Sequence, residues 1–381
     1  MPKRPNTKRR PKTQAPKHLD ARVKQFQKRL RDDGLDGMIV SNPKDIRYLT
    51  GFIGDDSWCY VPARGNGLTV VSDMRFFDHI PQEAPHVKVC MRGNKKSGRA
   101  SLAEATAGLL SKRKIDKVGV QAAYLTVPTR KAIAKAIGAK HVKDYDDKLI
   151  IQRSVKDAGE IKKIQEAVRI QQAAFTELRD YIQVGMTELE VCAYLEYRMR
   201  CLGADGPGFN TIVAFDGHSS HNHAIPGPQK LKKNSNILID WGACYQGYVS
   251  DMTRVLNVGK VKKHIAEIYK VVEEALHAGI DAVAPGVSLK EIDDASRNVL
   301  KKHGYKLVHG LGHGIGLNVH EQPGIGQHAD RVLEPGQVIT IEPGIYLGDK
   351  GGVRLEDDVL VTKTGAKNLS DLPTELDWTI I

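Results

Sequence analysis

Residues 236–254 read NILIDWGACYQGYVSDMTR, and they predict a β-hairpin with an acidic residue on each arm. Asp240 ends an apolar run, Asp251 begins the next run, and a turn is predicted at Tyr245-Gln246. If this turn is a two-residue loop, the residues that pair across the hairpin have numbers that sum to 491, as 240 and 251 do. The two aspartates would then face each other, with Cβ atoms about 4.5–5.5 Å apart.

A second hairpin is predicted around Glu342 and Glu356, which follow the apolar segments ITI and GVRL. A loop centred on Asp349 places these two glutamates in opposition. Like charges in direct opposition destabilise a sheet unless a cation lies between them. A carboxylate that ends an apolar run must also be neutralised, hydrogen-bonded or bound to a cation. Two such pairs of opposed carboxylates in one chain therefore indicate a metal-binding site.

His313 lies in the glycine-rich segment GLGHGIGL and supplies a neutral imidazole. Four negative charges and one neutral histidine balance two divalent ions. We therefore predict a two-metal hydrolytic site made of five residues. They are Asp240, Asp251, His313, Glu342 and Glu356.

Each of the five also has an ordinary structural alternative. The alternatives are a strand-end carboxylate for Asp240, an ion pair with Arg254 for Asp251, a turn position for Glu342, a solvated acidic run with Asp357 and Asp358 for Glu356, and a satisfied polar group for His313. The five segments taken together favour the metal site.

The composition is that of a globular protein with room for two domains. The chain has 381 residues, of which 41% are hydrophobic and 27% charged. It contains no apolar run of about 18 residues, so no membrane-spanning helix is expected. Five cysteines without a CxxC pair, and no signal peptide, predict a reducing cytoplasm.

The net charge of +12 is concentrated at the amino terminus. Residues 1–17 carry seven basic residues and no acid, which leaves +5 for the remainder. This segment has four prolines and almost no large apolar residue, so we assign residues 1–18 to a basic disordered tail. A solubilising extension is favoured over an arm that binds nucleic acid.

Residues 19–150 are predicted to form an α/β domain. A helix is expected at 20–34, a buried strand at 37–41, and a strand-edge loop at 42–52. No cluster of catalytic residue types occurs in this domain.

Residues 151–381 are predicted to form an α+β domain. Its helices should cover one face of a sheet whose other face holds the site. The pattern changes at Lys156, and helices are expected at 161–185, 187–203, 264–279 and 288–304, the last with a capping box at Ser288.

Two further histidines flank the predicted ligands. His320 follows His313 by seven positions, and His223 lies in the polar segment SSHNHAIP before the first ligand strand. Neutral imidazoles near a metal site can donate hydrogen bonds to a developing oxyanion.

At these motifs the chain resembles the pita-bread metallopeptidases, in the Xaa-Pro aminopeptidase and prolidase branch. The resemblance covers about residues 20–381, and it rests on the Asp-x10-Asp spacing and the segments GHGIGLNVHE, ITIEPG and GVRLED. The segment at 42–52 resembles the creatinase/prolidase-type amino-terminal domain. The implied fold is a creatinase/prolidase-like α/β amino-terminal domain followed by an α+β pita-bread catalytic domain.

The resemblance also implies a role for each site residue. Asp240 would bind one metal, Asp251 and Glu356 would bridge two metals, and His313 and Glu342 would bind the second, with Glu342 also moving a proton. His223 and His320 would stabilise the tetrahedral intermediate, and Arg354 would orient the carboxylates. The ions would be two divalent metals, manganese in the first place, with cobalt or zinc as alternatives.

The implied reaction is cleavage between an N-terminal residue and a following proline, by a homodimer. Some prolidases carry an arginine four positions after the second histidine, where this chain has Gly324. This difference favours an Xaa-Pro aminopeptidase over an Xaa-Pro dipeptidase. Creatinases and non-catalytic binding proteins of this fold have lost the metal ligands, whereas all five are present here.

Overall fold

The computed structural model describes residues 13–381, apart from residues 93, 96, 97, 100, 114 and 147. The chain divides into two compact units, Met1–Gln152 and Arg153–Ile381. Most of the predicted basic tail lies outside the described residues. Helix α1 (Lys17–Asp32) begins inside the segment that we assigned to the tail, three residues earlier than predicted. Our domain boundaries after residues 18 and 150 remain predictions.

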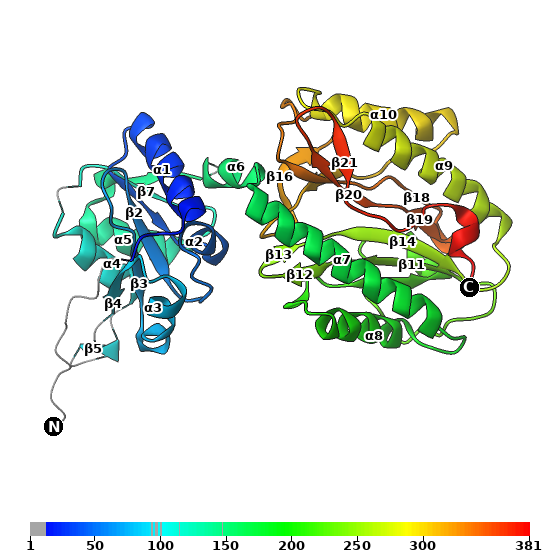
Figure 1. The fold of residues 1–381 in the computed structure, drawn as a ribbon, viewed down its shortest axis with the longest axis horizontal. Helices are drawn as coiled ribbons and strands as arrows, with labels where there is room; N and C mark the ends of the chain where they lie inside the picture. The colour runs from blue at the N-terminus through cyan, green and yellow to red at the C-terminus, as the bar shows by residue number, and fades with distance from the viewer. Residues whose placement is uncertain (1–12, 93, 96–97, 100, 114, 147) are drawn as a thin grey trace. The chain divides into compact units, whose positions relative to one another are not determined.

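The first unit is built on one mixed sheet with the strand order β4-β3-β2-β1-β7-β8 (Figure 1). Its strands are β1 (Gly37–Val40), β2 (Trp58–Pro62), β3 (Thr69–Ser72), β4 (Lys88–Met91), β7 (Val118–Val120) and β8 (Val142–Asp144), with a separate pair β5 (Asn94–Lys95) and β6 (Gly98–Arg99). Its other helices are α2 (Pro43–Thr50), α3 (His79–Glu83), α4 (Leu102–Leu110), α5 (Val127–Ile137) and α6 (Lys148–Ser154), which includes the residues where the units divide. Strand β1 is buried along its whole length, as predicted.

The segment 42–52 is a helix, so our prediction of a strand-edge loop was wrong. The Asn42 side chain accepts a hydrogen bond from the Lys44 N–H at 2.9 Å, and Pro43 occupies the first helical position. Gly51 ends the helix with a φ of +77°. An asparagine cap, a first-turn proline and a left-handed glycine are local helix signals that are fully present in the sequence.

The second unit contains two antiparallel pairs of helices. They are α7 (Ala158–Tyr181) with α8 (Glu188–Cys201), and α9 (Lys263–Asp281) with α10 (Leu289–Lys302). Capping boxes start α7, α8 and α10, which confirms the box predicted at Ser288. Within this unit the two pairs lie on opposite sides of the strands (Figure 1).

The strands of the second unit form several small sheets, rather than the single sheet with one covered face that we predicted. They are β10 (Ile212–Phe215), β11 (Asn236–Trp241) and β14 (Met252–Asn257) in one sheet, β9 (Gly206–Pro207), β12 (Ala243–Tyr245) and β13 (Tyr248–Val249) in another, β15 (Gly312–Gly314), β16 (Glu321–Ile325), β17 (Val338–Ile341), β20 (Asp357–Val361) and β21 (Ala366–Asn368) in a third, and the pair β18 (Gly344–Tyr346) and β19 (Gly352–Arg354).

Alternation along these strands sorts their side chains into two cores. Ile237 and Ile239 of β11 pack in the core of α7 and α8, whereas Leu238 packs in the core of α9 and α10. Because strand side chains alternate between faces, Asp240 shares the face of Leu238. The Asp240 side chain therefore points away from α7 and α8, toward the side of β11 that faces α9 and α10.

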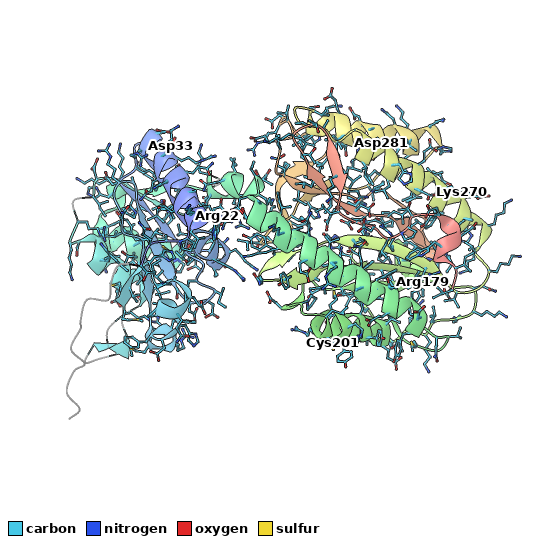
Figure 2. All side chains as sticks on the ribbon, in the orientation of Figure 1. Arg22, Asp33, Arg179, Cys201, Lys270 and Asp281 are labelled. Carbon is cyan, nitrogen blue, oxygen red and sulfur yellow. The ribbon has the colours of Figure 1, made fainter. Side chains whose placement is uncertain are left out.

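The carboxyl terminus is attached to the core of α7 and α8. Arg179, which Figure 2 labels in the last turn of α7, stacks over the Trp378 ring at 4.7 Å. It also donates a hydrogen bond to the Ile380 carbonyl at 3.3 Å. Among the residues described, no helix combines the length and apolar character needed to cross a membrane.

Candidate metal centre

The first predicted hairpin exists, but its register differs from our prediction. The turn lies at Gln246 and Gly247, which have φ of +46° and +74°, one residue later than predicted. In the ladder between β11 and β14, Asp240 lies opposite Thr253, so it does not directly oppose Asp251. Asp251 precedes Thr253 by two positions and shares its face. The two aspartates are therefore diagonal neighbours on one face.

The register predicted for the second hairpin is confirmed. The ladders β17–β20 and β18–β19 both pair residues whose numbers sum to 698. Glu342 and Glu356 lie between these two ladders and share this sum, so the hairpin brings them into opposition.

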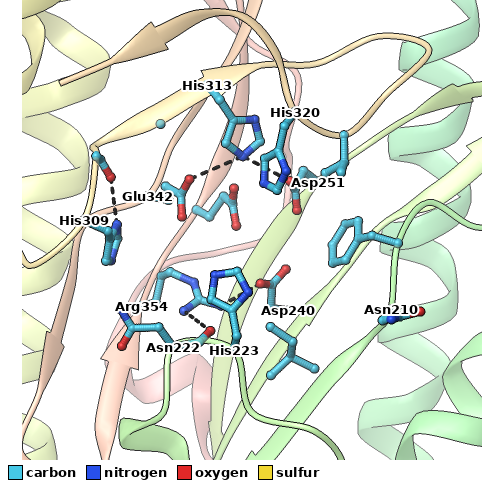
Figure 3. A pocket seen from close by; sticks show the side chains of 16 residues that line it. Asn210, Asn222, His223, Asp240, Asp251, His309, His313, His320, Glu342 and Arg354 are labelled. Carbon is cyan, nitrogen blue, oxygen red and sulfur yellow. Dashed lines mark hydrogen bonds and ion pairs between the residues drawn. The ribbon is translucent and has the colours of Figure 1, made fainter. Parts of the chain in front are cut away.

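All eight residues that the sequence nominated line a single cavity of about 400 Å³ (Figure 3). They are His223, Asp240, Asp251, His313, His320, Glu342, Arg354 and Glu356. They come from different strands and loops, so the fold collects them from across more than 130 residues of chain.

The ligand atoms of Asp251, His313 and Glu356 all lie within 4.8 Å of one another. His313 Nε2 is 3.7 Å from Asp251 Oδ2 and 3.4 Å from Glu342 Oε1. Asp240 Oδ2 accepts a hydrogen bond from Arg354 at 2.6 Å, whereas its Oδ1 is buried and has no hydrogen-bond partner among the described residues. Oxygen and nitrogen atoms that can bind a metal thus converge. One of these oxygens, Asp240 Oδ1, is buried and receives no hydrogen bond from the described residues.

Two of the ordinary alternatives are wrong. Arg254 pairs with Asp357 at 2.7 Å, with both side chains buried, so it is not the partner of Asp251. Asp357 and Asp358 are buried together with Glu356, so they form no solvated acidic run. Instead, Asp358 Oδ2 accepts the Asp251 N–H at 3.0 Å and thereby links the two hairpins.

Burial and mutual repulsion make the ionised carboxylates costly. Burial raises the pKa of Asp240, and burial followed by the neighbouring carboxylates raises the pKa of Asp251 and Glu356 well above their ordinary values. Burial raises the pKa of Glu342 to about 8 and, with His320 nearby, lowers the pKa of His313 to about 4. Divalent cations would remove this cost, and an oxygen-rich donor set suits hard ions such as Mn²⁺. The residues present therefore fit divalent metal.

The pKa of Glu342 predicts how the stability of the metal-free protein depends on pH. Between pH 6.5 and 8 the unfolded chain ionises this carboxyl, whereas the folded protein, with its pKa of about 8, retains the proton. Stability should therefore fall as pH rises, by about 1.4 kcal/mol per pH unit for a group that is fully protonated in the fold. His313 and His309 oppose this trend, most strongly below pH 6.5, where the unfolded histidines gain a proton and the folded ones, with pKa values of about 4, do not.

Thermal melts of chelator-treated protein at pH 6.5, 7.25 and 8 would measure this slope. We expect the midpoint to fall with pH, and to fall less steeply in Glu342→Gln. Equal slopes in the two proteins would contradict the prediction.

The sequence did not nominate His309 and Tyr346, although both belong to this site. Arg354 donates a hydrogen bond to the Tyr346 hydroxyl at 3.0 Å, and that hydroxyl lies 3.0 Å from His309 Nε2. A guanidinium has only donors, so the hydroxyl proton points to His309 Nε2, and His309 Nδ1–H donates to the Gly310 carbonyl at 2.7 Å. His309 was detectable as a second histidine directly before the glycine-rich segment, whereas no sequence pattern marked Tyr346.

Comparison with known proteins identifies the family. Residues 162–363 match the model of Metallopeptidase family M24, and residues 22–155 match that of the Creatinase/Prolidase N-terminal domain. The chain is 40% identical over 246 residues to an Xaa-Pro dipeptidase of Pyrococcus horikoshii, which covers 64% of this chain and 70% of that protein.

Two solved structures share the fold over nearly the whole chain. An Xaa-Pro dipeptidase from Bacillus anthracis is 30% identical, with a TM-score of 0.89, over 95% of this chain and 100% of that one. An X-Pro aminopeptidase from Thermotoga maritima MSB8 is 32% identical, with a TM-score of 0.83, over 91% and 98%. The resemblance and the fold class predicted from the motifs are thus confirmed. The chain belongs to metallopeptidase family M24, with a creatinase/prolidase-type amino-terminal domain and a pita-bread catalytic domain.

Proposed function

We propose that this metallopeptidase is an Xaa-Pro aminopeptidase with two metal ions, which cleaves the bond between an N-terminal residue and a following proline. The observation that carries the proposal is the convergence of four carboxylates and one histidine in one cavity. Manganese is the proposed metal, and cobalt and zinc are the alternatives. The sequence has five cysteines and no CxxC pair, which supports a reducing cytoplasm as the site of action. A homodimer remains part of the proposal.

The metal ligands would be Asp240, Asp251, His313, Glu342 and Glu356. Bound divalent ions would polarise the scissile carbonyl and allow a water to attack it at neutral pH. Glu342 would accept a proton from that water and deliver it to the leaving prolyl nitrogen. Arg354 orients Asp240 through the hydrogen bond at 2.6 Å.

The two exposed histidines would bind the developing oxyanion from different sides of the cavity. Figure 3 shows His320 beside Asp251 and His223 beside Asp240. The His320 ring packs edge-on against His313, with 4.4 Å between the ring centroids. Each imidazole can donate one hydrogen bond toward the carbonyl oxygen of a bound peptide.

The cavity lacks an obvious partner for the carboxylate of a dipeptide. Among its lining residues in the described part of the chain, Arg354 is the one arginine, there is no lysine, and the Arg354 guanidinium is bonded to Asp240 and Tyr346. A Cβ at Gly324, opposite His313 in the β15–β16 ladder, would meet no atom within 4 Å. The missing cationic partner supports a substrate longer than a dipeptide, and the open space at Gly324 shows that a longer side chain can be introduced there. The names of the relatives favour the second candidate, an Xaa-Pro dipeptidase, because two of the three are dipeptidases.

Substrate length tests the choice. We expect the manganese-loaded protein to cleave an Xaa-Pro-Yaa tripeptide with a higher kcat/KM than the matching Xaa-Pro dipeptide. The variant Gly324→Arg should raise the dipeptide kcat/KM about tenfold relative to the tripeptide, because a hydrogen bond to a charged group contributes about 1.5–3 kcal/mol. Gly324→Met is the matched control, with a long side chain and no charge.

Strict preference of the unmodified protein for the dipeptide would establish the dipeptidase instead. Cleavage of neither peptide by metal-loaded protein would favour a non-catalytic binding protein of the same fold.

A further inference from the structure

The loop 216–227 carries His223, and both of its ends are attached to a single buried carboxylate. Glu188, the first residue of α8, has a side chain with no exposed surface. Its Oε1 accepts the N–H of Phe215, where β10 ends and the loop begins, at 2.8 Å. Its Oε2 accepts the N–H of Gly227, where the loop ends, at 2.9 Å. The Glu188 carboxylate therefore links the two ends of the loop through hydrogen bonds.

The same carboxylate also contacts the first part of the loop. His218 Nδ1 lies 2.8 Å and 3.0 Å from the two Glu188 oxygens. Because an ionised carboxylate only accepts hydrogen bonds, this nitrogen carries a proton. His218 in turn packs edge-on against His221, with 5.3 Å between the ring centroids. Three donors of the loop thus converge on one buried anion.

The far part of the loop reaches the metal centre. Asn222 and His223 line the cavity, and the Asn222 carbonyl accepts a hydrogen bond from Arg354 at 3.4 Å. Ile225, two residues after His223, is 82% exposed, and His223 is itself exposed, whereas Ala224 between them is buried and packs in the core of α9 and α10. The position of His223 therefore depends on the contacts of Asn222 and Ala224 and on how the base of the loop is held. Glu188 does not itself line this cavity.

We propose that Glu188 is a positioning residue for His223, acting through the base of the loop. The inference rests on the proposed function, because it requires His223 to contact the reacting peptide. Its physical basis is that a displacement of about 1 Å in a catalytic group can lower the rate about a hundredfold.

Glu188→Gln is the sharpest variant, because it keeps the volume of the side chain and removes one acceptor. In either orientation of the amide, one loop end, Phe215 or Gly227, faces an NH₂ group and loses its acceptor. We expect kcat/KM for an Xaa-Pro-Yaa peptide to fall about 10- to 100-fold, the usual effect of losing a residue that orients a site from outside it. Metal content should not change, since Glu188 contacts no proposed ligand. Hydrogen exchange in peptides covering residues 216–227 should become faster.

Glu190→Gln is the matched control on the same helix. It removes the same charge from the same first turn, and its exposed carboxylate accepts hydrogen bonds from the Thr187 N–H at 2.7 Å and the Thr187 hydroxyl at 2.9 Å. It should leave both kcat/KM and the exchange of the loop within about twofold of the unmodified protein, as expected for a surface change.

A double-mutant cycle with His223→Ala separates positioning from general destabilisation. We expect His223→Ala to lower kcat/KM, and Glu188→Gln to have little further effect once His223 is absent. Equal effects of Glu188→Gln in both backgrounds would overturn the positioning role and leave the proposed function intact. Unchanged kcat/KM in His223→Ala would instead refute the role proposed for His223, and with it this inference.

His218→Leu provides a second route if Glu188→Gln does not fold. It removes one of the three loop donors and leaves both loop ends attached. We expect a smaller loss of kcat/KM that also disappears in the His223→Ala background, and a loss that persists there would overturn the proposal.

Discussion

Replacing Asp251 by asparagine is expected to abolish metal-dependent cleavage, with a loss of at least about a thousandfold in kcat/KM. The Asp251 carboxylate faces Glu356, Asp240 and Glu342, and its side chain is buried. An amide at this position binds a cation weakly and supplies no charge to balance it. The same change removes a buried, repelled carboxylate, so the metal-free variant should melt at a higher temperature than the metal-free unmodified protein.

These two effects have opposite signs, which makes the test stringent. The metal content of purified, manganese-treated protein and its thermal midpoint with and without manganese would be measured together. The unmodified protein should gain stability from manganese, because a ligand that binds only the folded state stabilises it. The variant should gain little.

Asp294→Asn is the matched control, since Asp294 lies exposed on α10 and pairs with Lys290 on the surface. It should change neither metal content nor cleavage. Full manganese binding by Asp251→Asn would show that the proposed ligand set is wrong.

Replacing Gly312 by alanine is expected to have the second largest effect. A Cβ at this position would lie 1.9 Å from the carbonyl oxygen of Thr340 and 2.7 Å from its carbonyl carbon. These are backbone atoms of the neighbouring strand β17, so no side chain can rotate to make room. Strands β15 and β17 would have to separate, and His313, the next residue, would move away from Glu342, which lies 3.4 Å from it. We expect a loss of about 3 kcal/mol in stability and about a hundredfold in kcat/KM.

Gly324→Ala is the control for this change, because Gly324 lies opposite His313 on β16 and a Cβ there would meet no atom within 4 Å. Its free energy of unfolding should stay within about 0.5 kcal/mol of the unmodified value. Urea unfolding and peptide cleavage would be measured on both variants. Equal stability of Gly312→Ala and Gly324→Ala would contradict the prediction, because it would show that β15 and β17 can separate without loss of stability.

Local signals decided which features were predictable. The capping box at Ser288 and the second hairpin were predicted correctly, because a cap and a short turn involve residues close in the chain. The helix at Pro43–Thr50 was missed, although its cap and stop residues were present. The turn of the first hairpin lies one residue later than predicted, because Gln246 and Gly247, both with positive φ, form it. A one-residue shift of the turn changes every cross-strand partner.

The sequence by itself nominated the residues that are proposed to carry the chemistry. Buried charge is costly, so carboxylates that end apolar runs are candidate metal ligands before any fold is known. Their assembly was decided by tertiary structure, because the Thr253 hydroxyl reaches Glu356 at 2.7 Å across 103 residues of chain. The supporting residues Tyr346 and Glu188 were also found only in the fold. A single buried hydrogen bond between distant segments leaves no periodic pattern in the sequence, so only the packing of those segments reveals it.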